Sequence, residues 1–459
     1  MKNLLVVGLI ALSFSFVSFA QSDADLRATI EKDRTSRASD GKLMTLSVGD
    51  HISRGFTYLD NRQFPQAREH FQKVLDVYPN DPLIQRALFG MGRALMWERE
   101  YARAIPYFDR VSREFSASKD GREGLAFKGA CHIRLGKNAE AAKSYEQYTV
   151  MYPSGERIDS AYLNIIDALR EAGRDAEAVS WVDKARQRFP GQPTEANALQ
   201  ARLRLEINRG RWADAEATAD TMLSQVKFNG SMTSTDEVLY LKGFAMEHGG
   251  KRNEAIAVYS SILDRPEIGT SYFGDLAKSK KLSIGEFSTS RKEWNKYHQD
   301  YPAAFRTDVL LEAKKRKLDP RFVMAIMKQE STFRPGVKSP SAARGLLQLV
   351  FDTALKYNKK AGYPALQPDD LYVPRTNIAI GCEYIAALRD QFGGLNEAIA
   401  ASYNGGEDNA ARWLNRSKPK EAGIFAAEIG FAETKNYVLK VMTSYRIYRD
   451  LYDENLVRR

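Results

Sequence analysis

A spacing of 37 residues dominates the first half of the chain. Five alanines keep this spacing, at Ala67, Ala104, Ala141, Ala178 and Ala215. Three glycines keep it as well, at Gly55, Gly92 and Gly129. An aromatic residue follows the first three alanines by four positions, at Phe71, Phe108 and Tyr145. A further unit, with Gly243, Ala255 and Tyr259, follows a polar stretch over 228–236 that we interpret as a loop insertion. A fixed period of this length indicates stacked supersecondary units rather than one globular core.

The repeated residues are those that paired antiparallel helices need. A small residue lets two helices approach closely, an aromatic side chain fills the space beside it, and a proline stops the second helix. Such prolines stand at Pro79, Pro153 and Pro190. The pattern resembles tetratricopeptide repeats, in about six units between Gly55 and Pro266. We expect the aromatic positions to be core and assign no catalytic residue there. A second protein is a candidate partner for the array.

The first 20 residues have the composition of an export signal. Lys2 precedes an apolar run from Leu4 to Val17, and Ser18-Phe19-Ala20 then offers a cleavage site of small residues. The run is too short to span a bilayer comfortably. We therefore predict cleavage after Ala20, an exported or periplasmic mature protein, and no stable membrane span. An uncleaved membrane anchor is the alternative. No cysteine lies near Ala20, so nothing indicates a lipid-bearing N-terminus.

The chain carries a net charge of +10. In a cytosolic protein this charge would suggest nucleic acid as a partner. For an exported protein, the available polyanions are the peptide carboxylates of the cell wall and anionic lipid headgroups. We predict no nucleic-acid partner, and attribute most of the excess to Lys and Arg dispersed over solvated helix faces. Cys131 and Cys382 are expected to be two buried free thiols rather than a disulfide.

From about Tyr301 onward the period disappears. Residues 301–459 contain no histidine and one cysteine, Cys382. Ser-His-Asp and Cys-His catalysis, His-based zinc helices and Cys-x-x-Cys metal sites are therefore excluded within this segment. Its chemistry must use carboxylates, hydroxyls, amides, Tyr, Lys or Arg. We expect neither a metal nor a cofactor.

One carboxylate of this segment stands where a core residue is expected. Asp319-Pro320 is typical of a helix N-cap followed by proline at the first helical position. Val323, Ile326 and Met327 form the apolar stripe of that helix, and the next position on the stripe is Glu330. Burial there would favour the neutral carboxyl and raise its pKa, as a general acid requires. A helix end turned to solvent, or a pair with a buried arginine, is the alternative.

Five groups of short strings follow from Glu330 onward in a fixed order. They are Glu330-Ser331-Thr332-Phe333; Ser339-Pro340 with Arg344-Gly345-Leu346-Leu347-Gln348-Leu349; Asn377-Ile378 with Gly381 and Tyr384; Ser402-Tyr403-Asn404-Gly405-Gly406; and Phe431-Ala432-Glu433-Thr434 with Tyr437-Val438. In this order and spacing the set resembles the catalytic domain of soluble lytic transglycosylases, which has a lysozyme-like fold. The resemblance covers about Tyr301 to Tyr448.

The resemblance implies an activity on the glycan strands of peptidoglycan. The bond between N-acetylmuramic acid and N-acetylglucosamine would be cleaved without water, leaving a 1,6-anhydro sugar. Glu330 would act first as the acid on the leaving oxygen and then as the base on the C6 hydroxyl. This needs one catalytic carboxylate, whereas a hydrolase of the usual type needs two. A hydrolytic muramidase, with Glu433, Asp369 or Asp370 as second carboxylate, and a periplasmic scaffold that only binds glycan are the alternatives.

The resemblance also implies substrate-binding roles for Ser331, Ser339, Gln348, Tyr403, Asn404 and Glu433. Gln348 would hydrogen-bond the glycan or its acetamido groups, unless it is a helix-surface amide. Tyr403 would hold the Glu330 carboxyl through its hydroxyl, unless it is a half-buried core tyrosine. The two serines would be cleft hydroxyls, although Ser331 also suits a turn cap, and Asn404 would line the cleft. Glu433 matches a family glutamate near the groove, or simply suits the N-terminal end of the last helix.

These patterns predict a mainly α fold with four segments. A signal peptide occupies 1–20 and an N-terminal extension 21–50. A tetratricopeptide-like helical superhelix occupies 51–300, and a lysozyme-like, α-rich catalytic domain occupies 301–459.

Overall fold

The protein is built from α-helices wherever the structure describes it. The computed structural model describes residues 15–263, 271–280 and 299–459. Over these ranges it contains no named strand, only isolated bridges such as Lys338–Arg344 and Arg344–Leu349. The predicted mainly α fold is confirmed.

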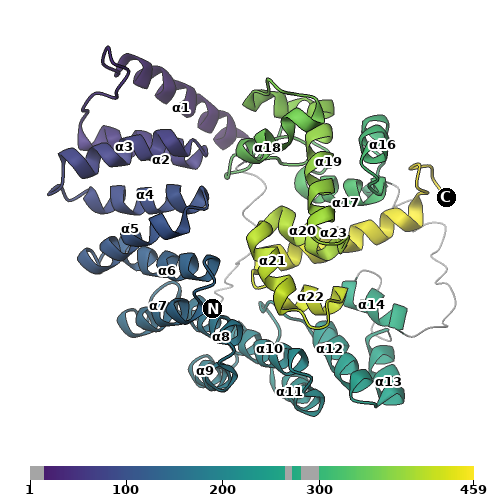
Figure 1. The fold of residues 1–459 in the computed structure, drawn as a ribbon. Coiled ribbons are helices and arrows are strands. Elements are labelled where there is room, and N and C mark those ends of the chain that lie inside the picture. The colour runs from purple at the N-terminus through teal and green to yellow at the C-terminus, as the bar shows by residue number, and fades with distance from the viewer. Residues whose placement is uncertain (1–14, 264–270, 281–298) are drawn as a thin grey trace, which may run out of the picture.

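The first set of helices forms a curved array. Consecutive helices pack against one another in antiparallel pairs, and the pairs stack into an arc that runs down one side of Figure 1 and along its bottom. The helices are α1 (Ser15–Thr35), α2 (Val48–Asp60), α3 (Phe64–Val77), α4 (Ile84–Trp97), α5 (Tyr101–Glu114), α6 (Lys119–Arg134), α7 (Asn138–Met151), α8 (Ile158–Glu171), α9 (Asp175–Arg188), α10 (Pro193–Asn208), α11 (Trp212–Gln225), α12 (Thr235–His248), α13 (Arg252–Leu263) and α14 (Tyr272–Lys280).

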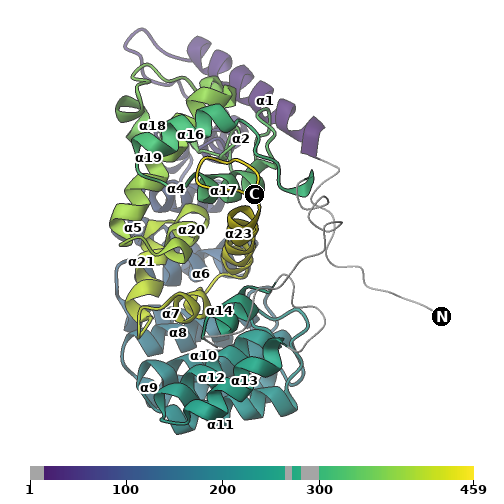
Figure 2. The same cartoon turned by 90° about the vertical axis from the view of Figure 1, so that its right-hand side faces the viewer.

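The second set of helices lies against the concave side of this arc (Figure 1). Figure 2, which views the molecule from that side, shows these helices in front of α4–α8. They are α16 (Arg306–Lys315), α17 (Pro320–Ser331), α18 (Phe351–Ala361), the 3-10 helix η2 (Pro368–Tyr372), α19 (Pro374–Gln391), α20 (Asn396–Gly405), α21 (Glu407–Arg416), α22 (Ala422–Glu428) and α23 (Ala432–Leu451).

The repeated glycines lie where two helices touch, as predicted. A Cβ on Gly92 would stand 2.7 Å from the ring of Phe108, and one on Gly243 would stand 2.6 Å from the ring of Tyr259. These distances are too short for any side chain, so the glycines permit the close approach. Each aromatic ring fills the space beside its glycine and is buried.

The predicted helix ends also agree with the structure. The three repeat prolines, Pro79, Pro153 and Pro190, follow the ends of α3, α7 and α9 by two residues each. The polar stretch after α11 is a loop that ends where Ser234 caps α12. Pro266, where the predicted array ends, lies outside the described residues.

Helix α1 begins at Ser15, so it runs across the predicted cleavage point after Ala20. Residues 1–14 of the predicted signal lie outside the described residues, and the signal stays a prediction. A search of the described helices finds none that combines the length and the apolar character needed to cross a membrane. Cys131 and Cys382 are both buried with free thiols, as predicted.

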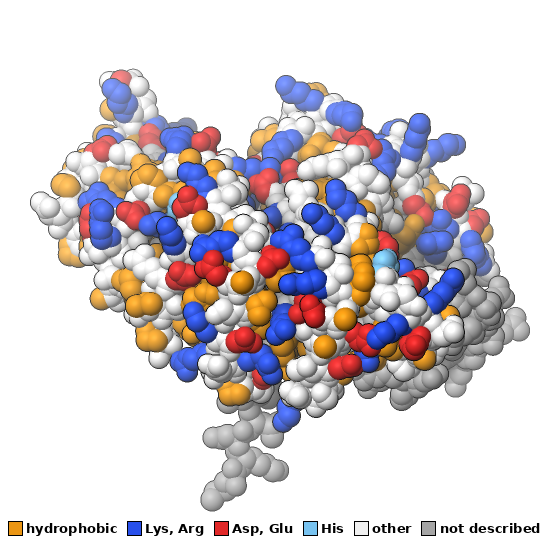
Figure 3. Space-filling view, turned by 60° about the horizontal axis from the view of Figure 1, so that its bottom comes forward, with side chains coloured by type: hydrophobic (Ala, Val, Ile, Leu, Met, Phe, Trp, Pro, Cys, Tyr) orange, Lys and Arg blue, Asp and Glu red, His pale blue; other side chains and the backbone are white. Residues whose placement is uncertain are grey.

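Charged side chains are mixed over the surface. On the face shown in Figure 3, Lys and Arg are interspersed with Asp and Glu rather than gathered in one basic patch. This agrees with the interpretation that the positive excess is dispersed over solvated helix faces.

The two sets of helices share part of their packing. One hydrophobic core draws its residues from Val309 to Leu456. Helix α22 belongs to two cores, because Phe425 packs into this one whereas Ile424, Ala426 and Ala427 pack into the core of α8–α14. The predicted division of the chain between residues 300 and 301 stays a prediction, since α22 joins the two parts.

A buried ionic cluster holds α22 in this position. Glu428 at the end of α22 is 0% exposed, and its carboxylate accepts hydrogen bonds from Arg170 at 2.7 Å, Arg204 at 2.9 Å and Asn208 at 2.7 Å. Arg416 lies 3.1 Å from the same carboxylate. Burial alone would raise the pKa of Glu428, but the three guanidinium charges outweigh it and lower the pKa to about 2. The carboxylate therefore stays charged inside the protein.

Replacing Glu428 by Gln is expected to lower the free energy of unfolding by about 3 kcal/mol, because three buried arginines lose one of their two shared counter-ions and keep only Asp167. Urea denaturation near neutral pH measures this loss. Glu177→Gln on α9 is the matched control, since its pair with Arg174 is largely exposed. We expect its effect to stay within about 1 kcal/mol. Equal unfolding midpoints for the two variants would contradict a structural role for the cluster.

Candidate functional site

The candidate acid, Glu330, stands in the last turn of α17. The Asp319 side chain accepts from the Arg321 backbone N–H and Pro320 opens the helix, as predicted. Val323 and Ile326 are fully buried along the stripe that Glu330 continues. Helix α17 ends immediately afterwards, because Thr332 adopts a left-handed backbone with φ 50°. The carboxylate is thus half-buried at the edge of a well-packed helix.

Helix α23 packs on α17 and supplies the partner of Glu330. The Tyr437 hydroxyl donates to Glu330 Oε1 at 2.6 Å. Burial has the largest effect on the carboxyl. Together with the negative charge of Glu433 it outweighs the hydrogen bond from Tyr437, which lowers the pKa, and raises the pKa of Glu330 to about 7. The group can therefore exist in both protonation states near neutral pH.

A cavity of about 530 Å³ lies between the two sets of helices. Glu330 and Tyr437 do not line it, but Glu433, whose charge acts on the Glu330 carboxyl, does. One wall carries Gln348, Tyr403, Asn404 and Glu433, which are four of the six residues with predicted substrate-binding roles. The opposite wall comes from the repeat array and includes Arg62, Met96, Trp97, Arg99, Tyr101, Ala130 and Arg134. The site is therefore a cleft with two walls rather than a groove in one domain.

Gln348 occupies a tight turn rather than a helix surface. Its backbone is left-handed, with φ 45°, and its side-chain amide donates to the carbonyls of Val337 at 3.1 Å and Gly345 at 2.9 Å. Gly345 is itself required here, since a Cβ would stand 2.1 Å from the Leu371 carbonyl oxygen. With its N–H groups used in the turn, Gln348 has its amide oxygen left to offer to a ligand.

Tyr403 and Asn404 both line the cavity, but the Tyr403 hydroxyl does not make the hydrogen bond to Glu330 that was one of its two predicted roles. The Tyr403 hydroxyl donates to the Leu347 carbonyl at 2.7 Å. The phenol that binds Glu330 is Tyr437, because α23 lies closer to the end of α17 than α20 does. Asn404 is exposed, and its Oδ1 accepts from the Thr434 hydroxyl at 2.7 Å, which fixes the amide at the cavity wall.

The two serines do not belong to the residues that line this cavity. Ser331 is 2% exposed, and its hydroxyl donates back to the Met327 carbonyl in its own helix. The Ser339 hydroxyl accepts from the Ala343 backbone N–H at 3.1 Å in the loop after α17. Both hydroxyls have intramolecular partners, and their roles as substrate contacts stay predictions.

Glu433 combines two of the features expected for it. It stands in the first turn of α23, where a negative charge suits the helix N-terminus, and it also lines the cavity. Its charge acts on Glu330, as the raised pKa of that carboxyl shows. Asp369 and Asp370 lie in η2 instead, where Asp370 accepts from the Gln367 backbone N–H.

Two features of the site were missed from the sequence. Tyr437 belongs to one of the quoted strings, and its spacing of four from Glu433 places both on one face of a helix. The second wall was missed because the array was expected to bind a separate protein partner and its aromatic positions were interpreted as core. Trp97 does not occupy the repeated aromatic position, and it is 47% exposed. An aromatic residue off the repeat register was the available signal.

No group of three or more metal-ligating side chains comes together in the parts of the chain that the structure describes. The groups that line the cleft are three tyrosines, three carboxylates, amides and guanidinium groups, and the Glu330 carboxyl of near-neutral pKa lies close to one of those carboxylates, Glu433.

Residues 309–425 match the family described as Transglycosylase SLT domain. The chain carries an SLT domain. Residues 54–119, 128–193 and 237–267 match tetratricopeptide repeats, so the SLT domain follows an array of these repeats. The predicted resemblance to soluble lytic transglycosylases with N-terminal tetratricopeptide repeats is confirmed by these matches and by the relatives.

The curated relatives are longer than this chain. A soluble lytic murein transglycosylase of Salmonella typhimurium is 29% identical over 287 residues, which are 62% of this chain and 42% of the relative. The protein of the same name from Escherichia coli is 28% identical over the same shares. The matched region thus spans less than half the length of these relatives.

Two solved structures share the fold of this chain. The lytic transglycosylase Slt of Pseudomonas aeruginosa has a TM-score of 0.51 at 18% identity, covering 94% of this chain and 78% of the other. The 70 kDa soluble lytic transglycosylase of Escherichia coli has a TM-score of 0.51 at 17% identity, covering 97% and 86%. At these identities the likeness concerns the fold alone.

Two substitutions are expected to shift the pKa of Glu330 in opposite directions. Tyr437→Phe removes the donor that stabilises the carboxylate, so it should raise the pKa above about 7, by about 1. Glu433→Gln removes a neighbouring negative charge and should lower the pKa. NMR titration of 13C-labelled glutamate carboxyls measures both shifts. Glu454→Gln, at a side chain 83% exposed, is the control. An unchanged midpoint in Tyr437→Phe would show that the hydrogen bond does not form in solution.

Proposed function

We propose that the protein is a peptidoglycan lytic transglycosylase with Glu330 as its catalytic residue. One observation carries the proposal. A carboxyl with a pKa of about 7, held by Tyr437, stands beside the two-walled cleft of an SLT domain. A group that is partly protonated near neutral pH can both give and take a proton within one reaction cycle.

The proposed reaction uses that single carboxyl twice. Protonated Glu330 transfers its proton to the glycosidic oxygen as the bond from that oxygen to C1 of N-acetylmuramic acid breaks. The carboxylate then removes the proton from the C6 hydroxyl of the same sugar, and the C6 oxygen bonds to C1. Acetamido assistance and this internal nucleophile remove the need for a second carboxylate. The product is a 1,6-anhydro sugar, and Glu330 ends in its protonated state.

The surrounding residues suit an uncharged sugar chain. Gln348 offers an amide oxygen and Asn404 an amide fixed by Thr434, both at the wall of the cavity. Tyr437 limits the rise in the pKa of Glu330 that burial and Glu433 produce. In this proposal Gln348, Asn404, Tyr403 and Glu433 position glycan in the cleft, and Tyr437 positions the carboxyl.

Peptidoglycan lies outside the cytosol, so the proposed substrate fits the expected export. The predicted signal over residues 1–20 would deliver the enzyme to the periplasm or another exported location, and the +10 net charge suits a wall that carries carboxylates. We propose this location together with the activity.

Glu330→Gln is expected to reduce the release of soluble fragments from purified sacculi by at least about 100-fold, because an amide cannot exchange the proton. The fold should persist, since amide and carboxyl are nearly isosteric. Circular dichroism melting checks this. Glu454→Gln, far more exposed, should digest sacculi as the unmodified protein does. Digestion by Glu330→Gln at the unmodified rate would make Glu330 structural and remove the proposal.

Mass spectrometry of the released fragments separates the transglycosylase from the hydrolytic alternative. Anhydro sugars at the fragment ends support the proposed reaction, whereas reducing ends show that water is the nucleophile. Glu433→Gln is informative here, because a hydrolase with Glu433 as second carboxylate would lose its activity. Sacculi that are bound but never cut would point to the glycan-binding scaffold instead.

A further inference from the structure

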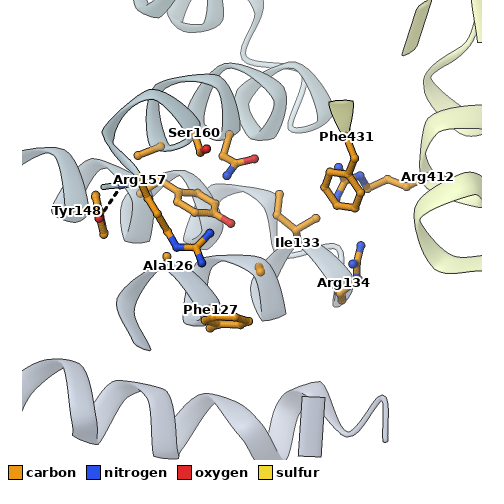
Figure 4. Close-up of a pocket in the computed structure, with 13 residues that line it drawn as sticks. Ala126, Phe127, Ile133, Arg134, Tyr148, Arg157, Ser160, Arg412 and Phe431 are labelled. Carbon is orange, nitrogen blue, oxygen red and sulfur yellow. Dashed lines mark hydrogen bonds between the residues drawn. The ribbon is translucent and has the colours of Figure 1, made fainter. Parts of the chain in front are cut away.

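A second pocket opens between the repeat array and the SLT domain. It has a volume of about 160 Å³ and lies between α6, α7 and α8 of the array, with Arg412 of α21 and Phe431 closing one side (Figure 4). Its apolar lining consists of Ala126, Phe127, Ala130, Ile133, Ala161 and Phe431. Tyr145, Tyr148, Ser160 and Asn164 add hydroxyl and amide groups.

The pocket adjoins the two-walled cleft. Ala130, Arg134 and Phe431 line both spaces, so these three residues form a shared rim. Figure 4 shows Arg134 at the end of its helix on the side of Phe431 and Arg412. A molecule in the cleft can therefore extend a branch past this rim and into the pocket.

The two spaces differ in charge. The cleft is lined by Arg62, Arg99 and Arg134 together with Glu407, Asp408 and Glu433, so its charges balance. The pocket is lined by Arg134, Arg157 and Arg412, and none of its lining residues is acidic. An uncharged chain suits the first space, and an anionic branch suits the second.

Arg134 is the guanidinium best placed to receive an anion. Arg157 already pairs with Glu123 at 2.8 Å, and Arg412 lies 3.0 Å from Glu171. Among the described residues, the polar partner of the Arg134 guanidinium is the neutral amide oxygen of Asn409. Within the described residues, the Arg134 guanidinium thus has no carboxylate partner. A ligand carboxylate at the rim could pair with it in the planar geometry that such pairs favour.

We infer that this pocket binds the carboxylate-bearing peptide branch of a peptidoglycan strand, with Arg134 binding a carboxylate and Phe127 and Phe431 contacting its apolar parts. The inference rests on the proposed function, which places the glycan itself in the adjoining cleft. It assigns to the tetratricopeptide repeats a direct part in substrate selection. Strands with free peptide carboxylates should therefore be preferred over strands whose peptides are neutral.

Three soluble glycan tetrasaccharides of one length test this. One carries peptides with free carboxylates, one carries the same peptides with the carboxylates converted to primary amides, and one carries no peptide. For the unmodified protein we expect kcat/KM to be about tenfold higher on the free-carboxylate substrate than on the amidated one, as one charge-assisted pair predicts. Arg134→Met should reduce this ratio to about one, and Arg134→Lys should restore part of it.

Two further variants separate the pocket from general effects. Ala130→Leu keeps the charge but narrows the shared rim, so it should also reduce the preference for peptide-bearing substrate. Arg113→Met removes a charge from an arginine 70% exposed on α5 and should leave the ratio unchanged. Melting temperatures identify any variant that fails to fold.

The outcomes distinguish this inference from the proposed function. If the unmodified protein cleaves none of the three substrates, the proposed function fails, and calorimetric binding of the same substrates still tests the pocket. A ratio, or an affinity difference, that survives in Arg134→Met overturns the inference while leaving the activity intact. Equal losses on all three substrates in Arg134→Met would assign Arg134 to domain docking through Asn409 and would also overturn it.

Discussion

The arrangement of the protein depends on one buried carboxylate. Glu428 is shared by Arg170 and Arg204 of the repeat array and by Arg416 of the SLT domain. Asp167 pairs with the same three arginines, so removing Glu428 would leave them with an excess of positive charge in the interior, which is costly. The cluster therefore specifies one docked position for α22. Further ion pairs join the repeat array to the second set of helices far from this cluster, such as Arg62 with Asp352 of α18 at 2.7 Å. Because both ends are held, the array becomes a wall of the active cleft.

Glu330 and Glu428 show how the same burial can serve opposite purposes. Burial alone raises the pKa of both carboxyls. Around Glu428, three guanidinium charges reverse this effect and hold the group ionised, so the carboxylate is structural. Around Glu330, burial and the negative charge of Glu433 raise the pKa, and a single phenol, that of Tyr437, opposes them. The pKa of Glu330 is therefore about 7. The difference between the docking residue Glu428 and the proposed catalytic residue Glu330 is the charge of their partners rather than the depth of burial.

Much of the local structure could be predicted from residue patterns. The period of Gly92, Phe108 and their equivalents predicted the helix pairs, because small and aromatic residues at fixed spacing have one common packing solution. The Asp319-Pro320 start and the stripe that reaches Glu330 predicted α17 and its unusual carboxylate. The sequence left open whether Tyr403 holds Glu330 or is a core tyrosine, since nothing in its own string states whether α20 or α23 lies nearer the end of α17. The packing of α22 into the repeat core was not foreseen either.

The sequence by itself determined the helical period, the exclusion of histidine chemistry from residues 301–459 and the choice of Glu330 as the candidate acid. Each of these depends on residues close together along the chain, where the periodicity of a helix relates spacing to position. Only the tertiary structure decided that Tyr437 holds Glu330 and that Trp97 and Arg134 form the second wall of the cleft. Those contacts join segments that are separated by about a hundred residues or more. They follow from how packed cores and buried charges dock, which no local spacing encodes.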